Sequence, residues 1–310
     1  MHLFVNTTLS DTLKAELQQQ LPPDITTQFR QDLPEAEQEA AFRAADLLLG
    51  NPPVAWFSEP LPTLKFWQLD SAGFDGYQSV QVPAQLANMG DYFARPCAET
   101  MMAGILALYR CIPELVLLQS RSEWVGVPIR ARTNSLWQKR VVILGTGTIG
   151  QAVRRMLSGF DCSTKMLART DPQADVHSAD ELKAILPETD IVINCLPGTA
   201  AGFVSVDVIA AMKPGSLYAN VGRGNTTDEP ALIQALKSGQ LGGAVLDVTD
   251  REPLPADSPL WTLPNVLLTQ HSGGGQPDEA AGKVAQFRRN LERFRAGQPL
   301  ENLVELNRGY

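Results

Sequence analysis

The segment "VVILGTGTIGQAVRRMLSGFDCSTKMLART", Val141 to Thr170, has the pattern of a strand, a glycine-rich turn, a helix and a second strand. Gly145, Gly147 and Gly150 have the G-x-G-x-x-G spacing directly after the first apolar run. At such a turn the first glycine allows a tight bend, the second lets a pyrophosphate approach the backbone, and the third lets helix and strand pack closely. We therefore predict a dinucleotide-binding turn rather than a plain glycine turn.

The residues beyond the glycines indicate which dinucleotide binds. The backbone amides of Thr148 and Ile149 lie at the positive end of the expected helix and should face the phosphates. An NAD site places an acidic residue at the end of the second strand, whereas this strand ends in Arg169 and Thr170. A guanidinium binds a ribose 2′-phosphate, which a carboxylate would repel. We expect NADP(H) to be preferred and NAD(H) also to be accepted, because Asp171 adds a negative charge; the alternative is that Arg169 is an ordinary surface arginine.

From Val141 onward, short β-branched runs alternate with helical runs, which is the pattern of βαβ units. One helical run opens with a capping box at Ser178 and Glu181, and another ends on Gly239. Six runs are expected to form buried parallel strands: RVVIL, TKMLA, DIVINCL, SLYANV, GAVLDV and NVLLTQ. The sequence therefore predicts an α/β fold with a six-stranded parallel Rossmann-type sheet that carries the glycine turn.

The sequence on either side of this block predicts a second, smaller domain. The runs ADLLLG and LKFWQL have the pattern of strands, and DTLKAELQQQL has that of a helix. The amphipathic run PDEAAGKVAQFRRNLERFRAG lies too far along to belong to the six-stranded sheet and is expected to return to the first domain. We predict a substrate domain of residues 1–98 and 276–310, with a dinucleotide-binding domain of residues 99–275 inserted in it.

Composition and charge limit the classes of function. The chain has 310 residues, of which 44% are apolar and 19% charged, and its net charge is −8. This charge argues against nucleic acid or an anionic membrane as a partner, so a small molecule is expected. The four cysteines show no C-x-x-C pair and no metal-ligand spacing, and the N-terminus lacks the features of a signal peptide. We therefore expect reduced thiols in the cytoplasm and no metal site.

The longest apolar segment, Ala98 to Gln119, has the length of a membrane span. Arg110 and Pro113 interrupt it with a charge and a helix breaker. A buried helix at a domain junction is therefore expected instead.

Several polar residues lie where the parallel strands are expected to end, the edge at which such sheets bind ligands. His271 follows the sixth strand. Arg223 lies between two glycines, and its guanidinium can donate two parallel hydrogen bonds to a carboxylate. Glu252 follows the fifth strand, and a carboxylate hydrogen-bonded to an imidazole favours the protonated ring that a proton donor needs. His177 lies beside the capping box and is expected to be structural. Taken singly, each residue is more often an ordinary surface group.

Longer stretches resemble a known enzyme family. LGTGTIG, NVGRGNTTDEPALIQALKSGQLGGAVLDV, REPLPADSPLWTLPNVLLTQH and DSAGFD are together similar to the D-isomer-specific 2-hydroxyacid dehydrogenases, from about Ala45 and most strongly from Val141 to Gly274. WQKRVVILGTG, Arg169 and the closing NRGY resemble the glyoxylate/hydroxypyruvate reductase A subgroup. The resemblance implies NADP(H)-preferring reduction of glyoxylate and hydroxypyruvate to D-2-hydroxy acids.

The family pattern also implies roles for individual residues. It makes His271 the proton donor, Glu252 its partner and Arg223 the substrate anchor. In a flavodoxin-like substrate domain, the backbone amides of Ala72 and Gly73 would bind the substrate carboxylate. The implied cofactor contacts are Gly145, Gly147, Thr148, Ile149, Gly150, Arg169, Thr170, Leu196, Pro197, Val221, Gly222, Asp247 and Gly274.

Further implications concern assembly and departures from the family. Asp247 would hold the nicotinamide carboxamide, and a homodimer is implied, with the segment from Trp124 to Trp137 as a contact arm. The usual proline before the histidine is Gln270 here, and the loop LPGTAAGFV is shorter than the common one.

Two other functions stay open. One is a dehydrogenase for bulkier aryl or branched 2-keto acids. Whichever acid is the substrate, Leu49, Gly50, Trp56 and Phe57 are candidate residues of its pocket. The other is an NADH-sensing, corepressor-like binding protein of the same fold. Formate dehydrogenases pair their histidine with glutamine, so Glu252 disfavours that activity.

Overall fold

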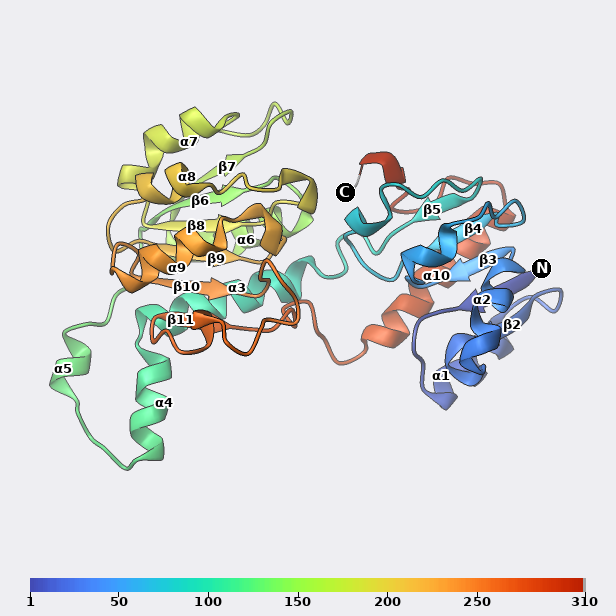
Figure 1. Ribbon diagram of the computed structural model, residues 1–310, viewed down its shortest axis with the longest axis horizontal. Coiled ribbons are helices and arrows are strands. Elements are labelled where there is room, and N and C mark those ends of the chain that lie inside the picture. The colour runs from blue at the N-terminus through green and yellow to red at the C-terminus, as the bar shows by residue number, and fades with distance from the viewer. Residues whose placement is uncertain (309–310) are drawn as a thin grey trace. The chain divides into compact units, whose positions relative to one another are not determined.

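The computed structural model describes residues 1–308 (Figure 1). The chain forms two compact units: unit 1 contains Met1–Tyr92 and the residues from Gln276 onward, and unit 2 contains Phe93–Gly275. The boundary that the sequence suggested between residues 98 and 99 lies inside α3 (Ala94–Tyr109), which is continuous. The last two residues of the closing NRGY lie outside the described part of the chain.

Unit 2 contains a six-stranded sheet in which all strands are parallel, in the order β11-β10-β9-β8-β6-β7. The six predicted strands are confirmed: β6 (Arg140–Leu144), β7 (Ser163–Leu167), β8 (Ile191–Asn194), β9 (Leu217–Asn220), β10 (Gly243–Leu246) and β11 (Val266–Leu268). The strand order reverses between β6 and β8, and ligands of such sheets bind at this point, outside the carboxyl ends of the strands.

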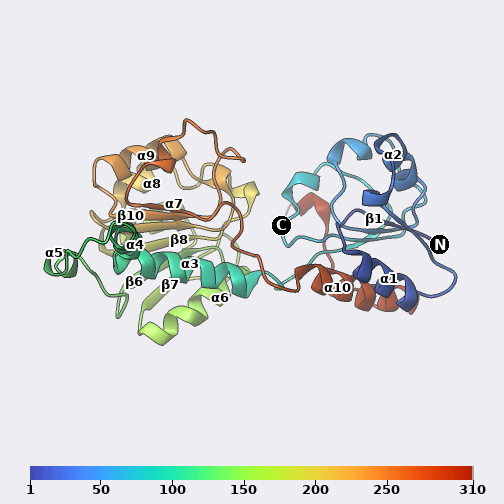
Figure 2. The same ribbon diagram turned by 90° about the horizontal axis from the view of Figure 1, so that it is seen from below.

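Helices cover both faces of this sheet (Figure 2). On one face lie α3 and α6 (Thr148–Leu157), and on the other lie α7 (Ala179–Ile185), α8 (Val206–Ala211) and α9 (Glu229–Lys237). Alternate residues of β6 pack into the two cores, Val141 and Ile143 with α3 and α6, Val142 and Leu144 with the other helices. This alternation buries both faces, which explains why the strands are continuous apolar runs.

Unit 1 contains a five-stranded parallel sheet with the order β2-β1-β3-β4-β5, the flavodoxin-like order. Its strands are β1 (His2–Val5), β2 (Thr26–Phe29), β3 (Leu47–Leu49), β4 (Phe66–Gln68) and β5 (Gln85–Ala87). The sequence indicated only β3 and β4; β1, β2 and β5 were not predicted, and β2 has the largely polar sequence TTQF.

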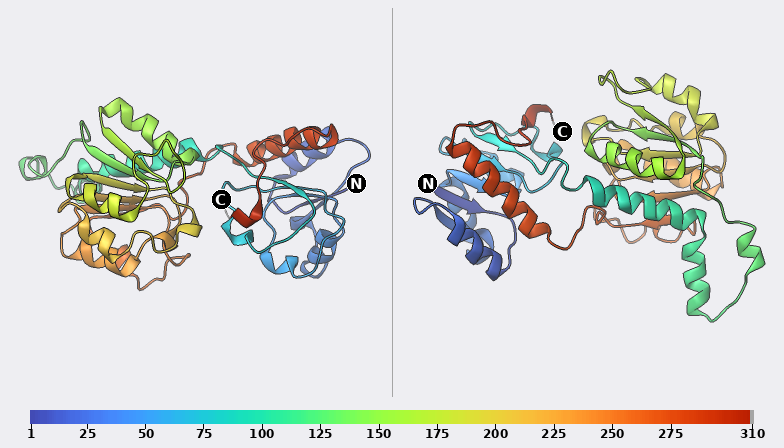
Figure 3. Two further views of the ribbon diagram at one scale, coloured as in Figure 1. Left: turned by 90° about the horizontal axis from the view of Figure 1, so that it is seen from above. Right: turned by 180° about the vertical axis from the view of Figure 1, so that it is seen from behind.

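The helices of unit 1 also lie on both faces of its sheet (Figure 3). On one face are α1 (Asp11–Gln20) and α10 (Glu279–Arg295), and on the other is α2 (Glu35–Arg43). Phe287 of α10 stacks on Phe66 of β4 with ring centroids 5.6 Å apart. The amphipathic run that was expected to return to the first domain therefore completes the core of unit 1.

Two of the candidate pocket residues pack into the cores of unit 1, one fully buried and one partly buried. Leu49 is fully buried in β3, so the expectation that it lines a pocket is wrong. Phe57 stacks on Trp67 at 4.9 Å between centroids and is part of an aromatic cluster.

The apolar segment Ala98–Gln119 forms two helices, because α3 ends at Tyr109 and α4 (Ile112–Ser120) begins after a bend of 68°. Burial was correctly expected for α3, whereas no residue of α4 is buried. Cys111, with φ of +55°, turns the chain away from the sheet. Within residues 1–308 no single helix is long and apolar enough to cross a membrane, although the bent pair together reaches that length and composition.

Candidate active site

The glycine turn leaves open space in front of α6. Gly145 has φ of +104°, and a Cβ atom on Gly150 would lie 2.4 Å from the carbonyl oxygen of Gly145, so glycine is required for this close packing. A Cβ atom on Gly147 would meet nothing within 4 Å. The amides of Thr148 and Ile149 are in the first turn of α6, where N–H groups have no partner within the helix. This geometry fits a bound pyrophosphate.

The end of β7 presents one cation and one fixed anion. Arg169 and Thr170 are exposed. The carboxylate of Asp171 accepts a hydrogen bond from the Gln173 amide at 2.9 Å and another from the Thr146 hydroxyl, and these bonds lower the pKa of Asp171. Asp171 is therefore charged at neutral pH and lies beside the glycine turn, while Arg169 stays accessible.

Two buried asparagines, which the sequence analysis missed, hold the loops after β8 and β9. The Oδ1 atom of Asn194 accepts a hydrogen bond from the Leu196 amide, and that of Asn220 accepts one from the Gly222 amide, both at 3.0 Å. Each asparagine ends an otherwise apolar run, IVIN or LYAN, which is the signal that could have identified it. These bonds fix the loops that contain four of the expected cofactor contacts, Leu196, Pro197, Val221 and Gly222.

Arg223 follows β9 and its backbone is held firmly. Its carbonyl oxygen accepts hydrogen bonds from the Thr226 hydroxyl at 2.6 Å and from Asn220 Nδ2 at 3.2 Å. A Cβ atom on Gly224 would lie 1.8 Å from the carbonyl oxygen of Thr249, so glycine is required where this turn packs against the loop after β10. The guanidinium is half-buried at the carboxyl end of the sheet.

Asp247 ties the end of β10 to the loop that follows β11. Its Oδ1 atom accepts hydrogen bonds from the Thr269 hydroxyl at 2.6 Å, the Ser272 amide at 3.1 Å and the Gly273 amide at 2.9 Å. Its backbone oxygen accepts the His271 amide at 2.6 Å. The side chain is buried, and its Oδ1 atom already accepts hydrogen bonds from the loop that contains His271 and leads to Gly274.

His271 and Glu252 form a hydrogen-bonded pair at this edge of the sheet. The Nδ1 atom of His271 lies 2.7 Å from Oε2 of Glu252, and Oε1 of Glu252 accepts the Thr249 amide at 3.1 Å. Gln270 and His271 both have φ of +54°. Proline is restricted to φ near −65°, so the family's usual proline does not fit the backbone at Gln270.

A pocket of about 410 Å³ adjoins this pair. His271 and Glu252 supply part of its polar lining, and Leu254, Trp261 and Leu268 supply much of its apolar lining. Its volume lies within the range of small-molecule sites, about 300–1,000 Å³.

The Ala72–Gly73 turn follows β4 in unit 1. The carbonyl oxygen of Ala72 accepts a hydrogen bond from Asn88 Nδ2, and that of Gly73 accepts one from the Ser71 hydroxyl, both at 2.6 Å. Within residues 1–308, the N–H groups of Ala72 and Gly73 donate no hydrogen bond. The carbonyl groups are thus held while the two amides remain available to an anion.

The remaining histidines and the cysteines make structural contacts. His2 Nδ1 lies 2.7 Å from the Thr26 hydroxyl, and His177 Nδ1 lies 2.9 Å from the carbonyl oxygen of Ala168. Burial raises the pKa of the Cys97 thiol to about 12. In the described part of the chain, all four cysteines are free and no three His, Cys, Asp or Glu residues are placed to hold a metal ion.

Comparison with known proteins shows the family. Residues 102–273 match the model of the NAD-binding domain of the D-isomer specific 2-hydroxyacid dehydrogenases. The chain is 32% identical to glyoxylate/hydroxypyruvate reductase A of Serratia proteamaculans over 223 residues, 70% of this chain and 69% of that protein. It is also 32% identical to reductase B of the same organism over 259 residues, 80% of each chain. The chain belongs to the D-isomer-specific 2-hydroxyacid dehydrogenase family.

A solved structure agrees with this assignment. The D-isomer specific 2-hydroxyacid dehydrogenase of Xanthobacter autotrophicus Py2, crystallised with NADPH and MES, is 26% identical to this chain, with a TM-score of 0.78 over 100% of this chain and 99% of that one. The predicted α/β fold, with its Rossmann-type NAD(P)-binding domain, is therefore confirmed.

Proposed function

We propose that the protein reduces small 2-keto acids, chiefly glyoxylate and hydroxypyruvate, to D-2-hydroxy acids with NADPH. The observation that carries this proposal is the contact of 2.7 Å between His271 and Glu252 at the carboxyl end of the parallel sheet. Arg169 at the end of β7 supports the NADPH preference, because its exposed guanidinium suits a 2′-phosphate. The names of the related reductases support the substrate class.

The reaction needs a proton donor and a positive field at the keto oxygen. The bound cofactor supplies the hydride that reaches the keto carbon. His271 donates a proton to the oxygen as negative charge develops there, and Glu252 stabilises the protonated ring through Nδ1. Arg223 binds the substrate carboxylate and stabilises the developing charge. In the oxidation direction, neutral His271 takes the proton from the hydroxyl group.

Backbone amides complete the proposed binding groups. The amides of Ala72 and Gly73 bind the substrate carboxylate, since their carbonyl groups are already occupied. The open space at Gly147 and the first turn of α6 accept the pyrophosphate, and the held loops after β8 and β9 line the cofactor site.

The pocket beside His271 and Glu252 favours a second candidate function. Glyoxylate and hydroxypyruvate leave much of a volume of about 410 Å³ unfilled. Leu254, Trp261 and Leu268 offer apolar surface to an aryl or branched side chain. A dehydrogenase for bulkier 2-keto acids is therefore the alternative within the same mechanism.

We also propose a homodimer whose contact includes the arm formed by α4, α5 (Val127–Arg130) and the residues that follow to Trp137. Figure 3 shows α4 and α5 extending from the rest of unit 2. Trp124 is 97% exposed and Val127 is 78% exposed, and Val116 and Leu117 of α4 are also exposed. An apolar surface of this kind is typical of a protein–protein interface.

Initial rates with glyoxylate, hydroxypyruvate, pyruvate and phenylpyruvate, each with NADPH and NADH, test the function. The highest kcat/KM should occur with glyoxylate or hydroxypyruvate and NADPH. A highest value with phenylpyruvate would establish the bulkier-acid alternative instead. Negligible turnover of every acid, with tight cofactor binding, would favour the corepressor-like binding protein.

A further inference from the structure

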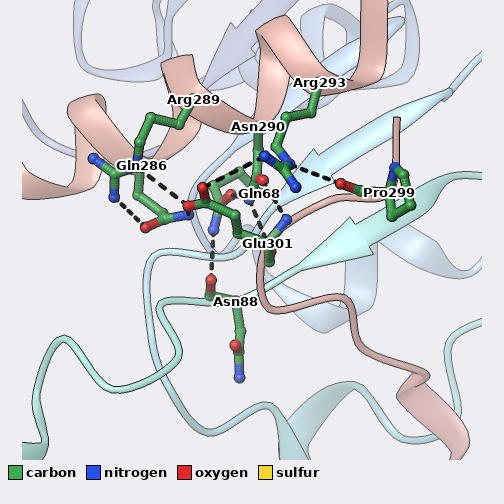
Figure 4. Close-up of polar contacts among 8 residues, drawn as sticks. All are labelled: Gln68, Asn88, Gln286, Arg289, Asn290, Arg293, Pro299 and Glu301. Atoms are coloured by element: carbon green, nitrogen blue, oxygen red, sulfur yellow. Dashed lines mark hydrogen bonds and ion pairs between the residues drawn. The ribbon is translucent and has the colours of Figure 1, made fainter. Parts of the chain in front are cut away.

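A buried network of side-chain amides joins α10 and the segment after it to the sheet of unit 1 (Figure 4). Oε1 of Gln68, in β4, accepts a hydrogen bond from Asn290 Nδ2 of α10 at 2.8 Å. Nε2 of Gln68 donates to the carbonyl oxygen of Asn88 at 3.0 Å. Gln68 and Asn290 are fully buried, so these bonds fix the orientation of both side-chain amides.

Glu301 holds Asn290 in this orientation. The Glu301 amide donates to Asn290 Oδ1 at 2.8 Å, and Asn290 Nδ2 donates to the Glu301 carbonyl oxygen at 3.0 Å. The Glu301 carboxylate accepts hydrogen bonds from Gln286 at 3.1 Å and Arg289 at 3.3 Å (Figure 4), which lower its pKa. The carboxylate therefore remains charged at neutral pH.

The network ends at Asn88, directly after β5. The backbone of Asn88 makes a second contact in addition to that with Gln68. Its amide donates a hydrogen bond to the Asn302 carbonyl oxygen at 3.1 Å. The Asn88 side chain accepts the Gly90 amide at 2.9 Å and donates to the carbonyl oxygen of Ala72 at 2.6 Å.

This last bond sets the direction of an amide that the proposed reaction uses. In a trans peptide the C=O and N–H groups point in opposite directions. Asn88 holds the Ala72 carbonyl group, so the Gly73 N–H points away from the end of β5. The Ser71 carbonyl oxygen accepts a hydrogen bond from the Met89 amide at 3.0 Å, so the Ala72 N–H also points away from the end of β5.

We propose that Asn88 is a positioning residue, which keeps the Gly73 amide directed toward the substrate carboxylate and is itself held through Gln68 and Asn290. This inference rests on the proposed function, because it assigns the carboxylate to this turn. Without the Asn88 side chain, the Ala72–Gly73 peptide can rotate and the Gly73 amide is no longer fixed in direction.

The test compares Asn88→Ala with the parent protein. We measure kcat and KM for glyoxylate at saturating NADPH, the affinity of the NADPH-bound protein for oxamate by calorimetry, and thermal unfolding. KM and the dissociation constant of oxamate should each rise roughly 3- to 10-fold, the effect of one lost hydrogen bond. The value of kcat and the NADPH affinity should change by less than about twofold, since Asn88 acts on ground-state binding.

Two further variants make the result specific. Asn88→Leu keeps the side-chain volume without the donor and replaces Asn88→Ala if that variant does not fold. Asn265→Ala is the control, because it removes a comparable hydrogen bond from Asn265 Nδ2 to the Leu236 carbonyl oxygen at 3.2 Å. Asn265 lies at the opposite end of β11 from His271, so this variant should leave KM unchanged. Parental KM and oxamate affinity in a folded Asn88 variant would overturn the inference. Absent turnover in the parent protein would overturn the proposed function instead, and oxamate binding would still report on Asn88.

Discussion

The imidazole of His271 and the carboxylate of Glu252 are in direct contact, with Nδ1 and Oε2 separated by 2.7 Å, although the residues are 19 positions apart. Because Nδ1 is occupied by the carboxylate, Nε2 is the nitrogen left to exchange a proton in the proposed mechanism. The contact is partly open to solvent, with 54% of the His271 side chain exposed, so a substrate can reach the ring. The backbone bond from His271 to Asp247 keeps the ring at the end of the sheet.

Substitution His271→Ala should lower kcat at least about 10²-fold, the usual contribution of a positioned acid. NADPH affinity should be retained, because the phosphate-binding turn is elsewhere in unit 2. Steady-state rates and cofactor titrations measure these effects. Parental turnover in His271→Ala would refute the mechanism.

Substitution Arg169→Ala should weaken NADPH binding by about 10- to 150-fold, the effect of one charge-assisted hydrogen-bonding partner. NADH binding should change little, because NADH has no 2′-phosphate for the guanidinium to bind. Fluorescence titrations with the two cofactors measure the difference. Arg155→Ala, which removes an exposed arginine in the last turn of α6, is a matched control. Equal losses for both cofactors would contradict the role assigned to Arg169.

The sheet of unit 2 was predictable because its strands are buried on both faces and therefore appear as continuous apolar runs. In unit 1, β2 has the largely polar sequence TTQF and β5 begins with the exposed Gln85, so neither appears as a continuous apolar run. The apolar content of α4 did not reveal its exposure, since composition does not say which neighbour covers a helix.

The candidate site was predictable only in part, for a related reason. His271 and Glu252 were identified because both follow strands of one parallel sheet. Two other contacts join segments that are distant in sequence: the hydrogen bond from Asn88 to Ala72, and the hydrogen bond that Asp247 accepts from the loop containing His271. Both depend on how a side chain is oriented. No local pattern encodes such an orientation.

The double substitution Val116→Glu and Leu117→Glu should shift the protein from dimer to monomer, because two charges on the exposed face of α4 would have to be buried in the interface. The dissociation constant of the dimer should rise by at least about tenfold, which corresponds to 1.4 kcal/mol. Sedimentation equilibrium measures it. Val206→Glu on α8, at a similarly exposed site, is the control. A monomeric parent protein would rule out the dimer itself.

Substitution Asp46→Asn should destabilise the protein at pH 7, and should do so less near pH 3. The pKa of Asp46 is lowered by hydrogen bonds from Lys65 Nζ at 2.7 Å and from the His2 amide at 2.8 Å. A lowered pKa contributes stability above the unfolded value of about 3.9, and this stability is lost as pH falls through the folded value. We expect a loss of about 1 kcal/mol at pH 7 for this partly exposed pair. Thermal unfolding at both pH values, with Asp257→Asn as the control, measures it.

The discontinuity of unit 1 imposes an order on folding during synthesis. Leu3, Val5 and Phe66 form one core with Val284, Phe287 and Leu291 of α10. The ribosome completes the whole of unit 2 before it makes α10, so the part of this sheet face that α10 covers stays exposed until α10 has been synthesised. Unit 2, whose residues are continuous in sequence, can therefore fold first, while the nascent N-terminal segment keeps apolar surface exposed and is the part more prone to aggregate.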